Sequence, residues 1–145
     1  MTPAPHAGLD GLGRAPHRRR APSRRTGAAM AAEAATFALA SAAHFAVGFT
    51  DAAIPELLIA VVLGLGSSAV FFQRPHAWGA AVGTTSFAAL GTIVGLTIVA
   101  TGRQDAPDLA YHATILAALA ATLIALRRRR NAARRPVSWS RPPRL

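Results

Sequence analysis

Residues 77–101 read AWGAAVGTTSFAALGTIVGLTIVAT, a run without a single charged side chain. About 20 consecutive apolar residues are enough to cross the hydrocarbon core of a bilayer as an α-helix. A helix that is apolar on every side has to be buried, either inside a large protein or in lipid. The stretch therefore predicts a transmembrane helix.

Three further apolar stretches are long enough to cross a bilayer, and short polar breaks separate all four. The stretches are Ala28 to Phe49, Ile54 to Phe72 and Leu109 to Leu126, and the breaks are Thr50 to Ala53, Gln73 to His76 and Gly102 to Asp108. Short connections of this kind join antiparallel neighbours in helix bundles. The sequence predicts an all-α fold, a four-helix antiparallel transmembrane bundle over residues 28–126.

The composition agrees with one small membrane domain. Apolar residues make up 52% of the 145 residues and charged residues only 15%, which leaves too few polar residues to coat four apolar helices in water. Cysteine is absent, which excludes disulfides, thiolate metal sites and cysteine nucleophiles. The chain also has no phosphate-binding loop, GxSxG motif or dinucleotide fingerprint, so we expect neither enzymatic activity nor a cofactor.

The basic residues predict the topology. All 16 are arginines, and the net charge is +10. Every arginine except Arg103 lies in one of the two tails or in the second break, at Arg74, whereas the first break carries Asp51. Short arginine-rich loops stay on the cytoplasmic side of a membrane. The chain is therefore expected in the inner (plasma) membrane as a multi-pass protein with both termini cytoplasmic.

Both tails, residues 1–27 and 127–145, are rich in arginine and proline and are expected to be disordered cytoplasmic segments. Their arginines suit anionic lipid headgroups of the bilayer. Nucleic acid is disfavoured because no nucleic-acid-binding fold or set of stacking aromatic residues accompanies them. Two alternatives stay open at the N-terminus: cleavage as a secretory signal, and a translation start at Met30 instead of Met1.

Ionisable residues inside membrane spans are costly, so each suggests a function. The first stretch contains Glu33. If its helix begins near Met30, Glu33 lies at the interface, where water tolerates a carboxylate. If the helix begins near Gly27, Glu33 lies deeper and could exchange protons or bind a cation. The second layout resembles the small multidrug resistance exporters, which have four short helices and a membrane-embedded glutamate in the first.

Two histidines fall at similar depth, His44 near the outer end of the first stretch and His112 near the outer end of the fourth. We expect their rings to face each other and to hold a transition metal, relay a proton, ligate a haem or only fix helix packing. Asp108 precedes His112 by four positions and should orient its imidazole. Asp51 and Glu56 lie on the same external side and are further proton-linked or outer-shell candidates.

Small residues recur at helical spacing in the third stretch, which predicts close helix packing within the monomer or a homodimer face. The third stretch contributes Gly79, Gly83, Gly91 and Gly95, and the predicted facing residues of the second stretch are Gly64, Ser67 and Ser68.

Several short runs, among them residues 43–45, 48–51, 54–56, 90–96 and 108–112, resemble small four-helix membrane proteins of actinobacterial type over residues 31–130. The resemblance implies the four-helix fold, but that group has no assigned activity. We therefore expect a non-enzymatic structural or accessory membrane component, as a homo-oligomer or in a larger complex. The alternative is a small proton-coupled transporter or metal-binding protein that uses Glu33 or the His44/His112 pair.

Overall fold

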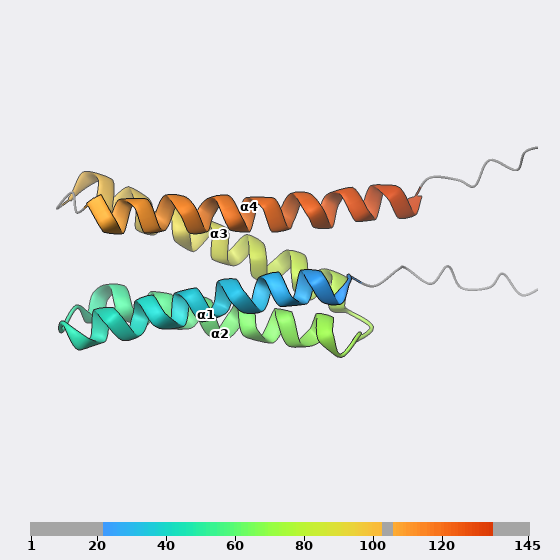
Figure 1. Ribbon diagram of the computed structural model, residues 1–145, viewed down its shortest axis with the longest axis horizontal. Coiled ribbons are helices and arrows are strands. Elements are labelled where there is room, and N and C mark those ends of the chain that lie inside the picture. The colour runs from blue at the N-terminus through green and yellow to red at the C-terminus, as the bar shows by residue number, and fades with distance from the viewer. Residues whose placement is uncertain (1–21, 103–105, 135–145) are drawn as a thin grey trace, which may run out of the picture.

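The computed structural model describes residues 22–102 and 106–134, which form four α-helices and, within these ranges, no strand. The helices are α1 (Arg24–Ala46), α2 (Thr50–Phe71), α3 (Ala77–Thr101) and α4 (Ala106–Arg134). Consecutive helices run in opposite directions (Figure 1). The all-α fold predicted from the sequence is confirmed.

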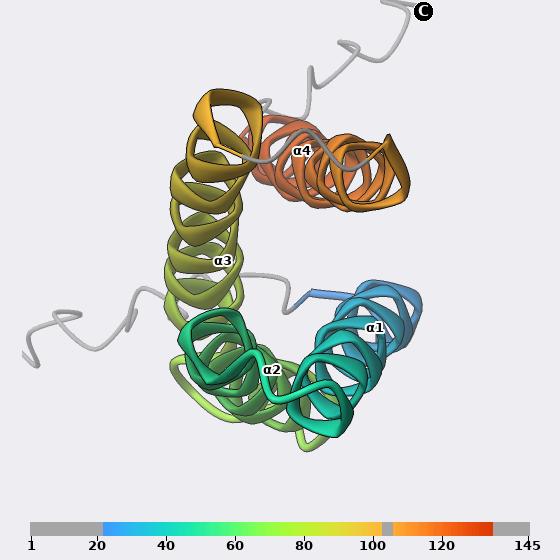
Figure 2. The same cartoon turned by 90° about the vertical axis from the view of Figure 1, so that its left-hand side faces the viewer.

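The helices are arranged in chain order around an open C (Figure 2). Each helix packs along the next one, whereas α1 and α4, at the two tips of the C, touch each other only sparsely. The start of α1, the α2–α3 connection and the end of α4 lie at one end of the bundle (Figure 1). We call this end, which carries Arg24, Arg25, Arg74 and Arg127 to Arg130, the arginine end.

The first connection, residues 47–49, lies earlier in the chain than the sequence predicted, because α1 ends before Gly48. Gly48 has a φ of 75°, a conformation that side-chain-bearing residues rarely adopt. The Phe49 N–H donates to the His44 carbonyl oxygen at 2.9 Å, and the Gly48 N–H to the Phe45 carbonyl oxygen at 3.1 Å. This is the Schellman pattern, which satisfies carbonyl groups left free at the end of a helix.

Other predicted boundaries also need correction. Residues 50–53, predicted as a break, form the first turn of α2. The first helix begins at Arg24 instead of Ala28, capped by the Ser23 hydroxyl. The last helix continues to Arg134, so residues 127–134 of the predicted disordered tail are helical. Only the bounds of α3 agree fully with the sequence prediction, and the tail residues 1–21 and 135–145 lie outside the described part of the chain.

Three helices of the described chain are long and apolar enough to cross a membrane: α2, α3 and α4. The predicted fourth span, α1, is not among them, although its 23 residues would suffice in length. The reason is its composition, because α1 consists largely of alanine and includes Glu33, Ser41 and His44. Alanine contributes less apolar surface than the leucine, isoleucine and valine of α2 and α3.

The side chains are sorted as a membrane protein requires. Buried positions between helices hold Met30, Phe37, Leu63, Val70 and Leu119, together with small alanines of α3. Large apolar side chains such as Leu39, Leu65 and Ile98 point outward with more than half of their surface exposed. A soluble monomer rarely exposes so much contiguous apolar surface. Lipid would cover these side chains without cost.

Only part of the predicted small-residue surface is used for packing. A Cβ atom on Gly66 would collide with the Thr84 side chain, and one on Gly91 would lie 2.7 Å from Ile59 Cδ1. A Cβ atom on Gly95 would lie 2.8 Å from His112 Nε2. An added Cβ on Gly64, Gly79 or Gly83 would meet nothing within 4 Å, so these glycines make no close helix contact in the described part of the chain, and the homodimer face stays a prediction.

Candidate functional site

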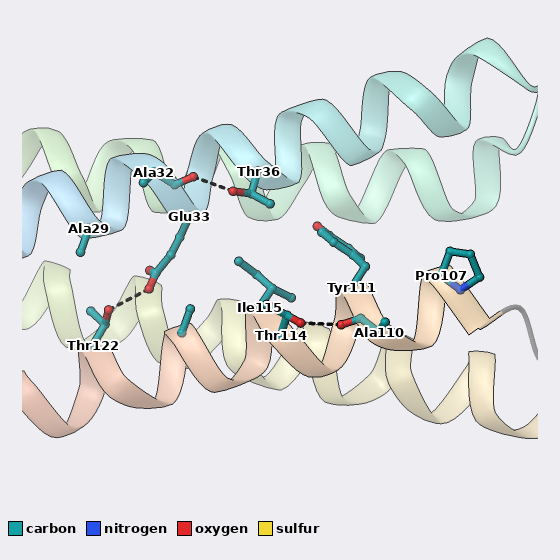
Figure 3. A pocket seen from close by; sticks show the side chains of 11 residues that line it. Ala29, Ala32, Glu33, Thr36, Pro107, Ala110, Tyr111, Thr114, Ile115 and Thr122 are labelled. Atoms are coloured by element: carbon teal, nitrogen blue, oxygen red, sulfur yellow. Dashed lines mark hydrogen bonds between the residues drawn. The ribbon is translucent and has the colours of Figure 1, made fainter.

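A groove of about 700 Å³ runs between α1 and α4, the two helices at the opening of the C (Figure 3). On α4 it extends from Pro107 to Thr122, about 22 Å at the rise of an α-helix. Most of its lining is alanine and other small or apolar side chains. The lining consists of Ala29, Ala32, Glu33 and Thr36 from α1 and Pro107, Ala110, Tyr111, Thr114, Ile115, Ala118 and Thr122 from α4.

Glu33 reaches across this groove from α1 to α4 (Figure 3). Its Oε1 accepts a hydrogen bond of 2.7 Å from the Thr122 hydroxyl, and both side chains are buried. Among the described residues this is the only side-chain hydrogen bond that joins these two helices. The second carboxyl oxygen, Oε2, is buried without a hydrogen-bond partner in the same part of the chain. One half of the carboxyl group is therefore buried without a partner among the described residues.

The start of α1 bears on the two depths considered for Glu33. Because α1 begins at Arg24, Glu33 lies nine residues into the helix, about 13 Å along its axis. This start corresponds to the deeper of the two alternatives, and the depth of Glu33 in a membrane stays a prediction. At this position Glu33 is only 5% exposed.

Tyr111 supplies a second buried polar group in the groove. Its ring extends from α4 toward α1 (Figure 3) and meets the Phe37 ring edge-on, with 6.3 Å between the ring centroids. The Tyr111 hydroxyl has no hydrogen-bond partner among the described residues. By contrast, Thr36 and Thr114 each donate to the backbone carbonyl four residues earlier. The unpaired groups of the groove are thus those of Glu33 and Tyr111.

The histidines lie near the opposite end of the bundle, each with its own carboxylate. His44 Nδ1 lies 2.7 Å from Glu56 Oε2, which links α1 to α2. His112 Nδ1 lies 3.1 Å from Asp108 Oδ1 and 2.9 Å from the Asp108 carbonyl oxygen. The contact expected between Asp108 and His112 is present. The His44–Glu56 pair was not expected, because it depends on how α1 and α2 align.

The metal site predicted at His44 and His112 has to be compared with these two histidine–carboxylate pairs. In the described ranges no group of three or more histidine, cysteine or acidic side chains is arranged to hold a metal ion. Each imidazole instead directs its Nδ1 to a carboxylate, and one Glu56 oxygen is buried without a partner. Asp51 is exposed in the first turn of α2 and belongs to neither pair. Metal binding by His44 and His112 stays a prediction.

Two serines that the sequence did not single out as functional fasten α1 to α2. The Ser41 hydroxyl donates to the Ala53 carbonyl oxygen at 2.7 Å, and the Ser67 hydroxyl donates to the Gly27 carbonyl oxygen at 2.9 Å. Both serines are buried. They hold α1 firmly along α2 and leave the opposite side of α1 free to line the groove.

Thr122 and Tyr111 are the groove residues that sequence reasoning missed. The signal was present, because both are polar side chains within an otherwise apolar stretch, but nothing in the local sequence connects either of them to Glu33. Comparison of the chain with protein-family models, with curated proteins and with solved structures gave no match. The resemblance to small actinobacterial membrane proteins therefore stays a prediction, and function has to be argued from the groove and the polar pairs.

Proposed function

We propose that all four helices cross the inner membrane and that both termini are cytoplasmic. The length of α1 and its close packing along α2 support a fourth span. The gathering of arginines at one end of the bundle supports the orientation. Reporter fusions at positions 51 and 103 should register as external, and fusions at 74 and 145 as cytoplasmic. An external C-terminus would contradict this topology.

We further propose that the protein is a non-enzymatic binding protein whose α1/α4 groove takes up a lipophilic cation. The observation that carries this proposal is the Glu33 Oε2 atom, which is buried in an apolar groove without a partner among the described residues. An isolated carboxylate away from water is costly unless a positive charge or a donor compensates it. A cationic ligand supplies that compensation.

The remaining features of the groove fit the same class of ligand. Its volume of about 700 Å³ lies within the range of sites for small molecules, roughly 300–1,000 Å³. Its alanine and isoleucine side chains suit alkyl or aryl groups, and Tyr111 offers an aromatic ring to a cation. The groove lies between two helices that pack sparsely, so a ligand can enter from the lipid side.

Proton-coupled transport would follow if Glu33 holds either a proton or the cation but never both at once. Movement of the cation would then be linked to movement of a proton in the opposite direction. Uptake of the cation into liposomes with an imposed pH difference should disappear in Glu33→Ala. Uptake that persists in this variant would contradict proton coupling through Glu33.

Binding is tested directly with the purified protein in nanodiscs and tetraphenylphosphonium as the probe. Glu33→Gln removes the charge but keeps an oxygen to accept the Thr122 hydrogen bond. We expect about tenfold weaker binding, or about 1.4 kcal/mol. Asp51→Asn removes one carboxylate charge outside the groove and should bind as the unchanged protein does. Equal affinity of the Glu33→Gln variant would contradict the proposal.

The structural or accessory role is the other outcome of this test. A transmembrane helix of a partner could lie along the same groove, since small residues allow close helix approach. The chain contains no cysteine, so single cysteines are unique labels. Absence of cation binding, together with cross-linking of one defined membrane protein by Ala118→Cys in the groove but not by Leu90→Cys on the exposed side of α3, would favour that role.

A further inference from the structure

A second cavity, of about 410 Å³, lies at the arginine end between the start of α3 and the end of α4. Its lining combines apolar and polar side chains. The lining residues are Trp78 and Val82 from α3 and Leu123, Arg127, Arg130 and Asn131 from α4. This cavity is separate from the α1/α4 groove and shares no residue with it.

The helical continuation of α4 to Arg134 is what builds this cavity. Arg127 and Arg130 are three positions apart and therefore project from the same face of the helix. Their neighbours Arg128 and Arg129 project elsewhere and do not line the cavity. A disordered tail, which the sequence predicted here, could not place two guanidinium groups beside one another in this way.

The two arginines have no acidic partner in the described part of the chain. The ion pairs found there both involve histidines and lie toward the opposite end of the bundle. Two uncompensated guanidinium groups and the Asn131 amide thus border one cavity. Guanidinium groups bind phosphate with two parallel hydrogen bonds, and the Asn131 amide can donate another.

The lining residues follow one another along the bundle in the order expected for a lipid headgroup and its acyl chain, from polar at the helix ends to apolar further in. Leu126 is fully buried and is the last residue before the arginine run. Trp78 stands in the first turn of α3, the level at which tryptophan gathers in membrane proteins. Val82 and Leu123 lie one turn deeper, where the upper part of an acyl chain would run.

We propose that this cavity is a binding site for the phosphate headgroup of an anionic glycerophospholipid. Arg127 and Arg130 hold the phosphate, Asn131 donates to it, and the lipid's acyl chain descends over Val82 and Leu123. Two positive charges favour a lipid with net negative charge over a zwitterionic lipid. The site depends on the face of α4 that carries Arg127, Arg130 and Asn131. It therefore differs from the general attraction between arginine-rich tails and a charged membrane.

Quenching of Trp78 fluorescence by brominated lipid tests the proposal. The chain has two tryptophans, so Trp139→Phe leaves Trp78 as the single reporter. The full-length protein is placed in phosphatidylcholine nanodiscs with increasing amounts of brominated phosphatidylglycerol or brominated phosphatidylcholine. We expect saturable quenching at low mole fraction for the anionic lipid, and for the zwitterionic lipid only the gradual quenching that random contact produces.

A matched pair of double variants separates the site from surface charge. The double variant Arg127→Gln/Arg130→Gln should weaken anionic-lipid binding about 25-fold, since each arginine contributes about a factor of five. The double variant Arg128→Gln/Arg129→Gln removes the same charge from other faces of α4 and should keep most of the binding. Equal weakening in both variants would overturn the site. Relief of quenching by millimolar inorganic phosphate would also overturn it, in favour of a site for free phosphate.

Discussion

Replacement of Thr122 by valine would test whether its hydrogen bond to Glu33 holds α1 against α4. Valine keeps the shape of threonine but cannot donate, so Glu33 Oε1 loses its partner and neither carboxyl oxygen then has one within the described residues. The Oγ1–Oε1 distance of 2.7 Å is typical of a hydroxyl that donates to a carboxylate. Such bonds contribute about 1.5–3 kcal/mol in soluble proteins, and interhelical bonds in membranes about 0.6–1.7 kcal/mol.

We expect Thr122→Val to lower the free energy of unfolding by about 1.5 kcal/mol. This value is near the upper end of the membrane range, because Glu33 is only 5% exposed and water has little access to replace the lost donor. Unfolding is followed by circular dichroism as the mole fraction of SDS is raised in mixed micelles. A double-mutant cycle with Glu33→Ala isolates the coupling between the two side chains, which we expect to be about 1 kcal/mol.

Thr114→Val is the matched control for this experiment. Thr114 lines the same groove on the same helix, but its hydroxyl donates to its own backbone and the side chain is exposed. This substitution should change the free energy of unfolding by less than about 0.5 kcal/mol. The reasoning is refuted if both threonine variants are equally stable, or if the cycle gives no coupling between Glu33 and Thr122.

Three further predictions concern helix packing and ends, measured by the same unfolding assay. Gly66→Ala should lower the free energy of unfolding by about 1–3 kcal/mol, because the added methyl group collides with α3. Gly64→Ala should leave stability unchanged or raise it slightly. Equal effects of the two substitutions would contradict the close contact of α2 and α3 at Gly66. Gly48→Ala should cost about 1–2 kcal/mol because of its φ of 75°, and an unchanged stability would argue against the observed end of α1. Ser67→Ala should lower the free energy of unfolding by about 1 kcal/mol, because its interhelical hydrogen bond is lost. Ser68→Ala should leave it almost unchanged, because the Ser68 hydroxyl donates within its own helix. A larger effect of Ser68→Ala than of Ser67→Ala would contradict the hydrogen bond between Ser67 and α1.

The sequence by itself determined the all-α fold, the bounds of α3 and the position of the arginines at one end of the bundle. These features are local. A helix in a bilayer satisfies its backbone hydrogen bonds within its own segment, so length and apolar character are enough to predict it. The end of α1 is also a local feature, because it depends on Gly48. Gly48 lies inside an apolar run, however, and the break was therefore predicted too late in the chain.

Only the tertiary structure decided which polar groups meet. Glu33 and Thr122 are separated by 89 positions, and His44 and Glu56 by 12, so neither contact follows from helical spacing. The apolar residues of α2 and α3 surround the helix on all sides and reveal no inward face. Without such a face, the sequence cannot indicate the rotation of each helix or the gap between α1 and α4. Packing decides both, through Gly66 against Thr84 and through the serine hydrogen bonds between α1 and α2.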